Sequence, residues 1–158
     1  DLTLAVAESL RASLERAGAA VRLSRDASPD FDQYSYRTMD SSERAAVANE
    51  LPADMLLAVH FNWYKSPSYG GTEVWHRGDR ADSARLAAVL QSHLVGLGLG
   101  DRGTRMGDYA VLRAAQMPAA LLELGFLSRP RDAAFFADPQ NIAIAAGLIT
   151  EALLEYYR

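Results

Sequence analysis

Near the N-terminus an apolar residue recurs every four positions, which is the spacing of an amphipathic helix. The repeating residues are Leu2, Val6, Leu10 and Leu14. Gly18 follows the last of them and is expected to end the helix. The same periodicity predicts a helix from about residue 79 to 97 and another that runs to Tyr156. The latter begins with Asp138 and Pro139, a pair that favours an N-cap followed by the first helical position.

Short apolar runs lie between these helices and predict strands. Residues 55–59 contain no polar side chain, which is typical of a strand buried on both faces of a sheet. The other segments that predict strands are residues 21–25, 72–75, 109–112 and 119–122. Because strands alternate with helices, the pattern predicts an α/β fold in which helices cover both faces of a sheet.

Two shorter helices complete this prediction. Ser41 or Ser42 can cap one that runs to about Asn49, and another lies near Ala134. The remaining segments are expected to be loops, at residues 26–40, 63–71 and 96–103. The last of these is rich in glycine, but it follows a helix and lacks the Lys of a phosphate-binding loop, so we expect a flexible connector.

The length of 158 residues predicts a single domain. The chain has 16 basic and 20 acidic residues, a net charge of −4, and no basic cluster, so no nucleic-acid partner is expected. No apolar stretch approaches the roughly 20 residues of a membrane span. The absence of cysteine excludes disulfides and thiol catalysis. The chain starts without Met inside a predicted helix, so we expect it to be a piece of a longer precursor.

Two polar residues follow buried strands at the point where α/β sheets bind ligands, outside the carboxyl ends of the strands. Glu123 interrupts the apolar run 119–126, where a carboxyl group without a partner has a raised pKa and becomes a candidate general base. The alternative is a strand-end Glu that points to solvent or pairs with an Arg. His60 follows the run 55–59, and its alternative is a buried His bonded to a backbone carbonyl.

The other two histidines are weaker candidates. We expect His76 on the surface and His93 on the face of a helix. The sequence contains no H-E-x-x-H, C-x-x-C or G-x-S-x-G motif, so neither a short-spaced zinc site nor a serine nucleophile is predicted.

Taken in order, several motifs resemble the zinc-dependent N-acetylmuramoyl-L-alanine amidases of the type 3 group, which cut bacterial peptidoglycan. The most telling are VHFN at 59–62, GTEVW at 71–75 and LELGFLS at 122–128. The other matching segments are residues 2–7, 21–26, 44, 48–49, 53–54, 101–103, 111–113 and 117–119. The resemblance implies a mixed, mostly parallel twisted sheet flanked by helices. It also implies that residues 1–158 are an amidase catalytic domain without its N-terminal strand and first metal-ligand segment.

In this family, zinc is held by two His and one Glu, with water in the open position. His60 matches the second metal His, and Glu123 matches the catalytic Glu; the first metal His and the metal Glu would lie upstream of Asp1. A catalytic zinc ion lowers the pKa of its water to about 7 and polarises the substrate carbonyl. Glu123 would take the proton from that water and deliver it to the leaving L-alanine nitrogen.

The implied substrate is peptidoglycan or a muropeptide, cut between N-acetylmuramic acid and L-alanine by a monomer outside the cytoplasm. Two alternatives stay open: a non-catalytic relative that binds peptidoglycan without a metal site, and a zinc peptidase that acts on the stem peptide. Trp63, Tyr64 and Tyr69 in the loop 63–71 are candidates for stacking on sugar or peptide, with a packed loop as the alternative.

Overall fold

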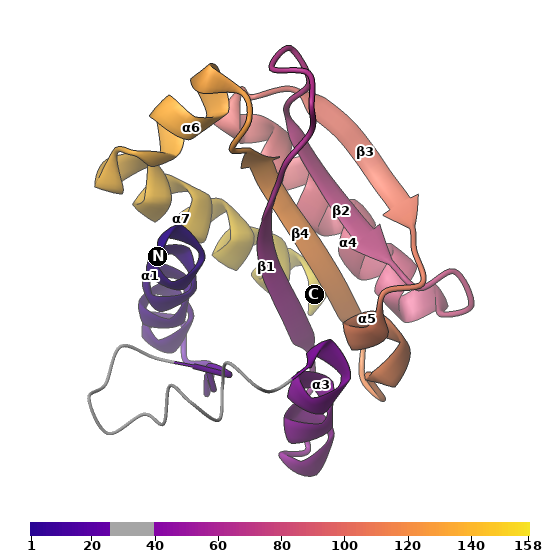
Figure 1. The fold of residues 1–158 in the computed structure, drawn as a ribbon. Helices are drawn as coiled ribbons and strands as arrows, with labels where there is room; N and C mark the ends of the chain where they lie inside the picture. The colour runs from indigo at the N-terminus through magenta and orange to yellow at the C-terminus, as the bar shows by residue number, and fades with distance from the viewer. Residues whose placement is uncertain (26–39) are drawn as a thin grey trace.

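The computed structural model describes residues 1–25 and 40–158 (Figure 1). Within them, four strands form one sheet, and six α-helices and one 3-10 helix accompany it. The elements in chain order are α1 (Leu2–Arg16), α3 (Ser41–Glu50), β1 (Leu56–Asn62), β2 (Thr72–His76), α4 (Ala81–Leu94), the 3-10 helix η1 (Val95–Leu97), β3 (Asp101–Met106), α5 (Ala110–Ala114), β4 (Ala119–Phe126), α6 (Pro130–Phe136) and α7 (Pro139–Tyr156).

The sheet has the strand order β1-β4-β2-β3. β1 runs parallel to β4 and β2 runs parallel to β3, whereas β4 and β2 are antiparallel. The sheet is therefore mixed and mostly parallel, and the predicted α/β fold class is confirmed.

The two faces of the sheet are covered to different extents. Alternate residues of β4 point to opposite faces. Leu122 and Leu124 are buried in a core formed with α1, α4 and α7. In Figure 1, α4 and α7 lie behind the strands and α1 lies to the left of β1. Ala119 and Leu121 face the other way and pack with α3 and α5. These two helices lie at one end of that second face, and no other described helix covers the rest of it (Figure 1).

The long helices agree with the periodic patterns. In α1, Val6 and Leu10 are buried, and Gly18 beyond its end has a φ of +93°, a conformation that glycine adopts without strain. In α7, the Asp138 side chain accepts a hydrogen bond from the backbone N–H of Gln140, and the helix begins with proline as predicted. The predicted helix 79–97 is α4 followed by η1.

The prediction that residues 55–59 are buried on both faces is wrong. β1 is at the edge of the sheet, its residues are mostly half-buried, and His60 is exposed. An apolar run of this length does not distinguish a central strand from an edge strand whose apolar side chains pack on helices at its flank.

Two segments predicted as strands are not strands. Residues 21–25 form no regular element, and none of the described strands pairs with them, whereas a strand needs such a partner for its ladder hydrogen bonds. Of residues 109–112, Tyr109 is instead the N-cap of α5 and the other three are its first residues. The neighbours Val111 and Leu112 are both buried on the same side, which a helix allows and a strand, with its alternating side chains, does not.

The glycine-rich connector ends in a strand that the pattern did not predict. Gly98 and Gly100 have φ values of +69° and +118° and form a turn, after which β3 starts at Asp101. β3 is polar because it is the other edge strand, and most of its residues are partly or fully exposed.

The N-terminus of α3 is capped by Asp40 rather than by either predicted serine. The Asp40 carboxylate accepts hydrogen bonds from the backbone of Ser42 and Glu43, and the Glu43 side chain accepts one in return from Asp40 N–H. This reciprocal arrangement satisfies more backbone donors than a serine at position 41 would. Of the loop predicted at 26–40, residues 26–39 lie outside the described part of the chain.

Candidate active site

The two residues singled out from the sequence lie side by side in the sheet. His60 of β1 and Glu123 of β4 are register partners across a parallel pair of strands. Paired residues point to the same face, and adjacent strands are about 4.8 Å apart. The two side chains therefore meet on the open face of the sheet, and not beyond the strand ends, because β4 continues for three residues after Glu123.

Polar residues continue across the whole sheet from this pair. Glu73 of β2 is the antiparallel register partner of Glu123, and two arginines of β3 form ion pairs with Glu73. We call this series the polar row: His60, Glu123, Glu73, Arg102 and Arg105. Each of the four strands thus contributes at least one charged or ionisable side chain to one surface.

Glu123 is half-buried, and its Oε2 atom is buried without a hydrogen-bond partner in the described chain. Desolvation, together with the smaller effect of the negative charge of Glu73, raises the pKa of this carboxyl group to about 7. The alternative of a pair with an Arg does not agree with this, since Glu123 makes no ion pair within residues 1–25 and 40–158, and the side chain does not point fully to solvent because its Oε2 is buried. A carboxyl group in this state suits proton transfer near neutral pH.

His60 is exposed, and its ring forms no hydrogen bond with any described residue. The alternative of a buried His bonded to a carbonyl is therefore wrong. The pKa of its imidazole is lowered because neighbouring atoms partly desolvate the ring and because the charge of Arg44 disfavours protonation. A neutral imidazole is the form that binds a metal ion.

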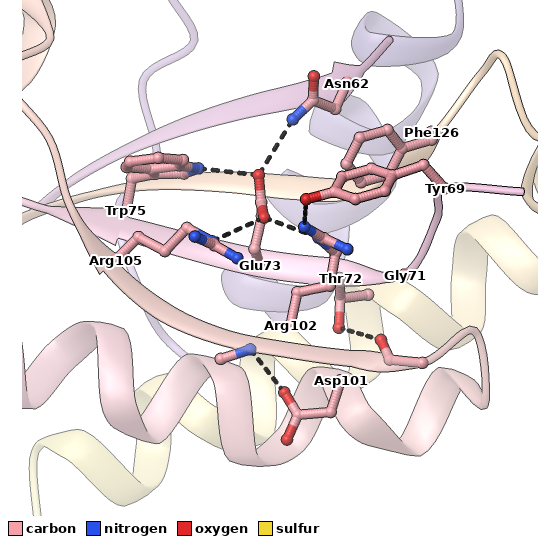
Figure 2. A network of polar contacts seen from close by, with 12 residues as sticks. Asn62, Tyr69, Gly71, Thr72, Glu73, Trp75, Asp101, Arg102, Arg105 and Phe126 are labelled. Carbon is pink, nitrogen blue, oxygen red and sulfur yellow. Dashed lines mark hydrogen bonds and ion pairs between the residues drawn. The ribbon is translucent and has the colours of Figure 1, made fainter. Parts of the chain in front are cut away.

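Glu73 is the most heavily bonded side chain of the polar row, and the sequence did not single it out. Figure 2 shows its carboxylate at the centre of four donors. Oε1 accepts from Asn62 Nδ2 at 3.0 Å and from Trp75 Nε1 at 3.2 Å. Oε2 accepts from Arg102 Nε at 2.9 Å and from Arg105 Nε at 3.0 Å. Glu73 is 3% exposed, so this carboxylate is a fixed, fully bonded anion.

Aromatic rings support the arginines of the polar row. The guanidinium of Arg102 lies 3.7 Å from the centre of the Tyr69 ring and also donates a hydrogen bond to the Tyr69 hydroxyl. Tyr69 in turn packs against Phe126 and Tyr64. Tyr69 is thus packed on one side but still 39% exposed, and Trp63, at the start of the same loop, is 69% exposed, so stacking on sugar or peptide stays a prediction.

A buried carboxylate holds the strand ends beside the site. Asp132 is 0% exposed, and its Oδ2 accepts hydrogen bonds of 3.0 Å from the backbone N–H groups of Gly71 and Phe126. Its Oδ1 accepts one of 3.2 Å from Arg129. The start of β2 and the end of β4 are thereby joined next to the polar row.

The described residues do not make a complete metal site. No group of three His, Cys, Asp or Glu side chains in residues 1–25 and 40–158 is placed to hold a metal ion. His76 is 8% exposed, so the prediction that it lies on the surface is wrong; its Nδ1 lies 3.1 Å from the Arg77 carbonyl oxygen. His93 lies on α4 as predicted and contacts Glu155 of α7.

Comparison with known sequences gives one consistent result. A family model described as N-acetylmuramoyl-L-alanine amidase matches residues 1–155. A Staphylococcus aureus protein named probable cell wall amidase LytH is 31% identical over 159 residues, which cover 99% of this chain and 49% of that protein. This chain thus spans about half the length of the curated relatives it matches. In the described part of the chain, no helix is long and apolar enough to span a membrane.

Solved structures share the fold. The catalytic domain of CwlV, an N-acetylmuramoyl-L-alanine amidase from Bacillus (Paenibacillus) polymyxa var. colistinus, has a TM-score of 0.86 and 30% identity, covering 99% of this chain and 83% of that one. An N-acetylmuramoyl-L-alanine amidase from Clostridium difficile 630 has a TM-score of 0.85 and 29% identity, covering 99% and 82%. AmiC2 of Nostoc punctiforme has a TM-score of 0.87 and 26% identity, covering 99% and 83%.

Proposed function

This chain belongs to the family of N-acetylmuramoyl-L-alanine amidases, and on that basis we propose that the protein hydrolyses the amide bond between N-acetylmuramic acid and L-alanine in peptidoglycan. The observation that supports this most is the pairing of His60 with Glu123 on adjacent strands. The resemblance predicts a metal ligand and a catalytic carboxyl group at these two positions. The protein would act outside the cytoplasm, where its substrate lies, and that it is a monomer stays a prediction.

In this proposal Glu123 is the group that moves protons. Its Oε2 is buried and has no hydrogen-bond partner in the described chain, so it has an unused acceptor for the water that would enter the site with the substrate. With a pKa of about 7, the carboxylate takes a proton from the attacking water and gives it to the leaving nitrogen. The oxygen of that water adds to the lactyl carbonyl carbon and the C–N bond breaks. The products are a lactyl carboxylic acid and a peptide with a free amino group.

We propose zinc as the cofactor, with His60 as one ligand. A catalytic zinc ion has about three protein ligands and an open position. The described residues supply only part of such a set, so the other ligands would come from residues outside those described. The lowered pKa of His60 supports the proposal, because it keeps the imidazole neutral and able to bind a cation at neutral pH.

The proposed reaction is tested with Glu123→Gln in the full-length protein. This variant removes the proton acceptor, so release of stem peptides from purified cell walls is expected to fall by about 100-fold or more. Circular dichroism checks that the fold is kept, and Glu15→Gln, an exposed change at the end of α1, is the matched control. Cell-wall lysis at the normal rate by Glu123→Gln would refute the assignment.

Mass spectrometry of the products separates the alternatives. Free lactyl carboxyl groups indicate an amidase, whereas cleavage within the peptide indicates a peptidase. Binding of muropeptides without any cleavage by the wild-type protein would instead support a non-catalytic relative. Metal analysis of the full-length protein tests zinc: His60→Ala is expected to lower the bound zinc, and His93→Ala, which changes the histidine beside α7, is expected to leave it unchanged.

A further inference from the structure

At the β3 end of the polar row, two positively charged side chains face the single negative charge of Glu73. Arg102 and Arg105 both donate to Oε2 of Glu73, so two guanidinium groups face one carboxylate. Glu73 would remain bonded to Arg102, Asn62 and Trp75 if Arg105 were absent. The second arginine is therefore not required to satisfy the buried carboxylate, and it leaves one positive charge on the surface.

Arg105 also has unused hydrogen-bond donors. Only its Nε atom bonds to Glu73, and its Nη1 and Nη2 atoms have no hydrogen-bond partner in residues 1–25 and 40–158. Its side chain is 40% exposed, whereas that of Arg102 is 16% exposed and lies over Tyr69. The bond to Glu73 and the Trp75 ring, 5.7 Å from the guanidinium, hold the Arg105 fork in place. A fork held this way is suited to a planar anion such as a carboxylate.

The spacing from Glu123 matches a short piece of extended peptide. Arg105 lies on β3, two strands away from β4 in the order β4-β2-β3. Two strand spacings are about 10 Å, and Arg105 pairs with Trp75, two residues along β2 from the Glu73 that pairs with Glu123, so the diagonal separation is about 12 Å. An extended peptide covers about 3.3–3.6 Å per residue, so a peptide whose first amide bond lies at Glu123 would bring a carboxylate of one of its first three residues to Arg105.

We propose that Arg105 is a specificity-determining residue that binds a free carboxylate of the stem peptide. Glu73 is a positioning residue in this arrangement, because its buried carboxylate orients Arg105 and offsets the charge of Arg102. The inference rests on the proposed function for the orientation of the peptide along the polar row. It adds a chemical preference: a stem peptide with a free carboxylate binds better than one in which this group is a carboxamide.

Binding without turnover tests the preference. The full-length protein with Glu123→Gln is titrated calorimetrically with two N-acetylmuramoyl peptides that differ only in a free carboxylate or a carboxamide within the first three residues. A charge-assisted hydrogen bond predicts about 10- to 100-fold tighter binding of the carboxylate. Adding Arg105→Gln is expected to remove this preference, whereas Arg16→Gln, which removes an equal charge from the end of α1, is expected to keep it.

Several results would overturn the inference: equal affinity for the two peptides, no binding of either peptide, or a preference that survives Arg105→Gln. If Arg105→Gln does not fold, Arg105→Lys replaces it; this variant keeps the charge but loses the planar fork, so at least part of the preference should disappear. Hydrolysis by the wild-type protein is measured separately. A preserved carboxylate preference without hydrolysis would refute the proposed function and leave this inference standing.

Discussion

Glu123 is expected to destabilise the fold at the pH where it would act. The carboxyl group has a pKa of 4.5 when unperturbed and about 7 in the folded chain. Because the folded pKa is raised, the stability that this group contributes is fully present below about pH 4.5 and is lost as the pH rises through 7. Replacing Glu123 with Gln removes the buried charge and keeps the shape, so the variant should be more stable than the wild type above pH 7.

The size of the effect follows from the same two values. A difference between 4.5 and about 7 corresponds to at most about 3.5 kcal/mol, at about 1.4 kcal/mol for each pH unit. Glu123 is only half-buried, so solvent screening reduces this to about 1–2 kcal/mol. For a chain of this length that gain raises the unfolding temperature by roughly 2–8 °C.

Thermal unfolding of the two proteins at pH 8 and pH 5, with a chelator present, measures this effect. The stabilisation by Glu123→Gln should be clear at pH 8 and small at pH 5. The matched control is Glu15→Gln, whose exposed side chain should give the same small difference at both pH values. If the unfolding temperatures of Glu123→Gln and wild type differed equally at the two pH values, desolvation of the carboxylate would not be the cause of the difference. If the wild type were more stable than Glu123→Gln at pH 8, the reasoning would be contradicted outright.

Three further expectations concern the scaffold. Asp132→Ala leaves two buried backbone N–H groups without an acceptor and should lower the free energy of unfolding by about 2–4 kcal/mol in urea, whereas Asp108→Ala, at an 82% exposed side chain, should change it little. Gly71→Ala should destabilise more than Gly18→Ala, because both have positive φ but only at position 71 would the new Cβ lie 2.6 Å from a carbonyl oxygen; equal losses would contradict this. Asp40→Ala should lower the unfolding temperature at pH 7. Hydrogen bonds to its carboxylate lower the pKa of Asp40 below 3.8. The difference in unfolding temperature between wild type and Asp40→Ala should therefore shrink only as the pH falls below about 3.8.

Local patterns were sufficient for much of the fold and for two residues of the site. The apolar spacing of α1, α4 and α7 predicted these helices, because a surface helix must bury one side whatever it packs against. Glu123 stood out because a charged residue inside an apolar run is unusual in any fold. His60 was found by its place after an apolar run, which also belongs to the local sequence.

Strand pairing and strand position depended on the tertiary structure. Whether residues 21–25 form a strand depends on a neighbour to bond with, and whether β1 is central or at the edge depends on which strands flank it. The spacing of apolar residues along the chain predicts neither the pairing partner of a strand nor its position in the sheet. For the same reason the local pattern predicts a flexible connector at residues 96–103, where β3, a polar edge strand, begins.

The polar row shows the same limit at the site. Glu73, Arg102 and Arg105 are ordinary strand residues along the chain, and only the register of β2 against β3 and β4 brings their charges together. The raised pKa of Glu123 follows from that arrangement too, since it depends on desolvation and on the charge of Glu73 across the strand pair. Residue types and their local environment are properties of the sequence. Distances between residues far apart along the chain, and the electrostatic energies that follow from them, exist only once the sheet has formed.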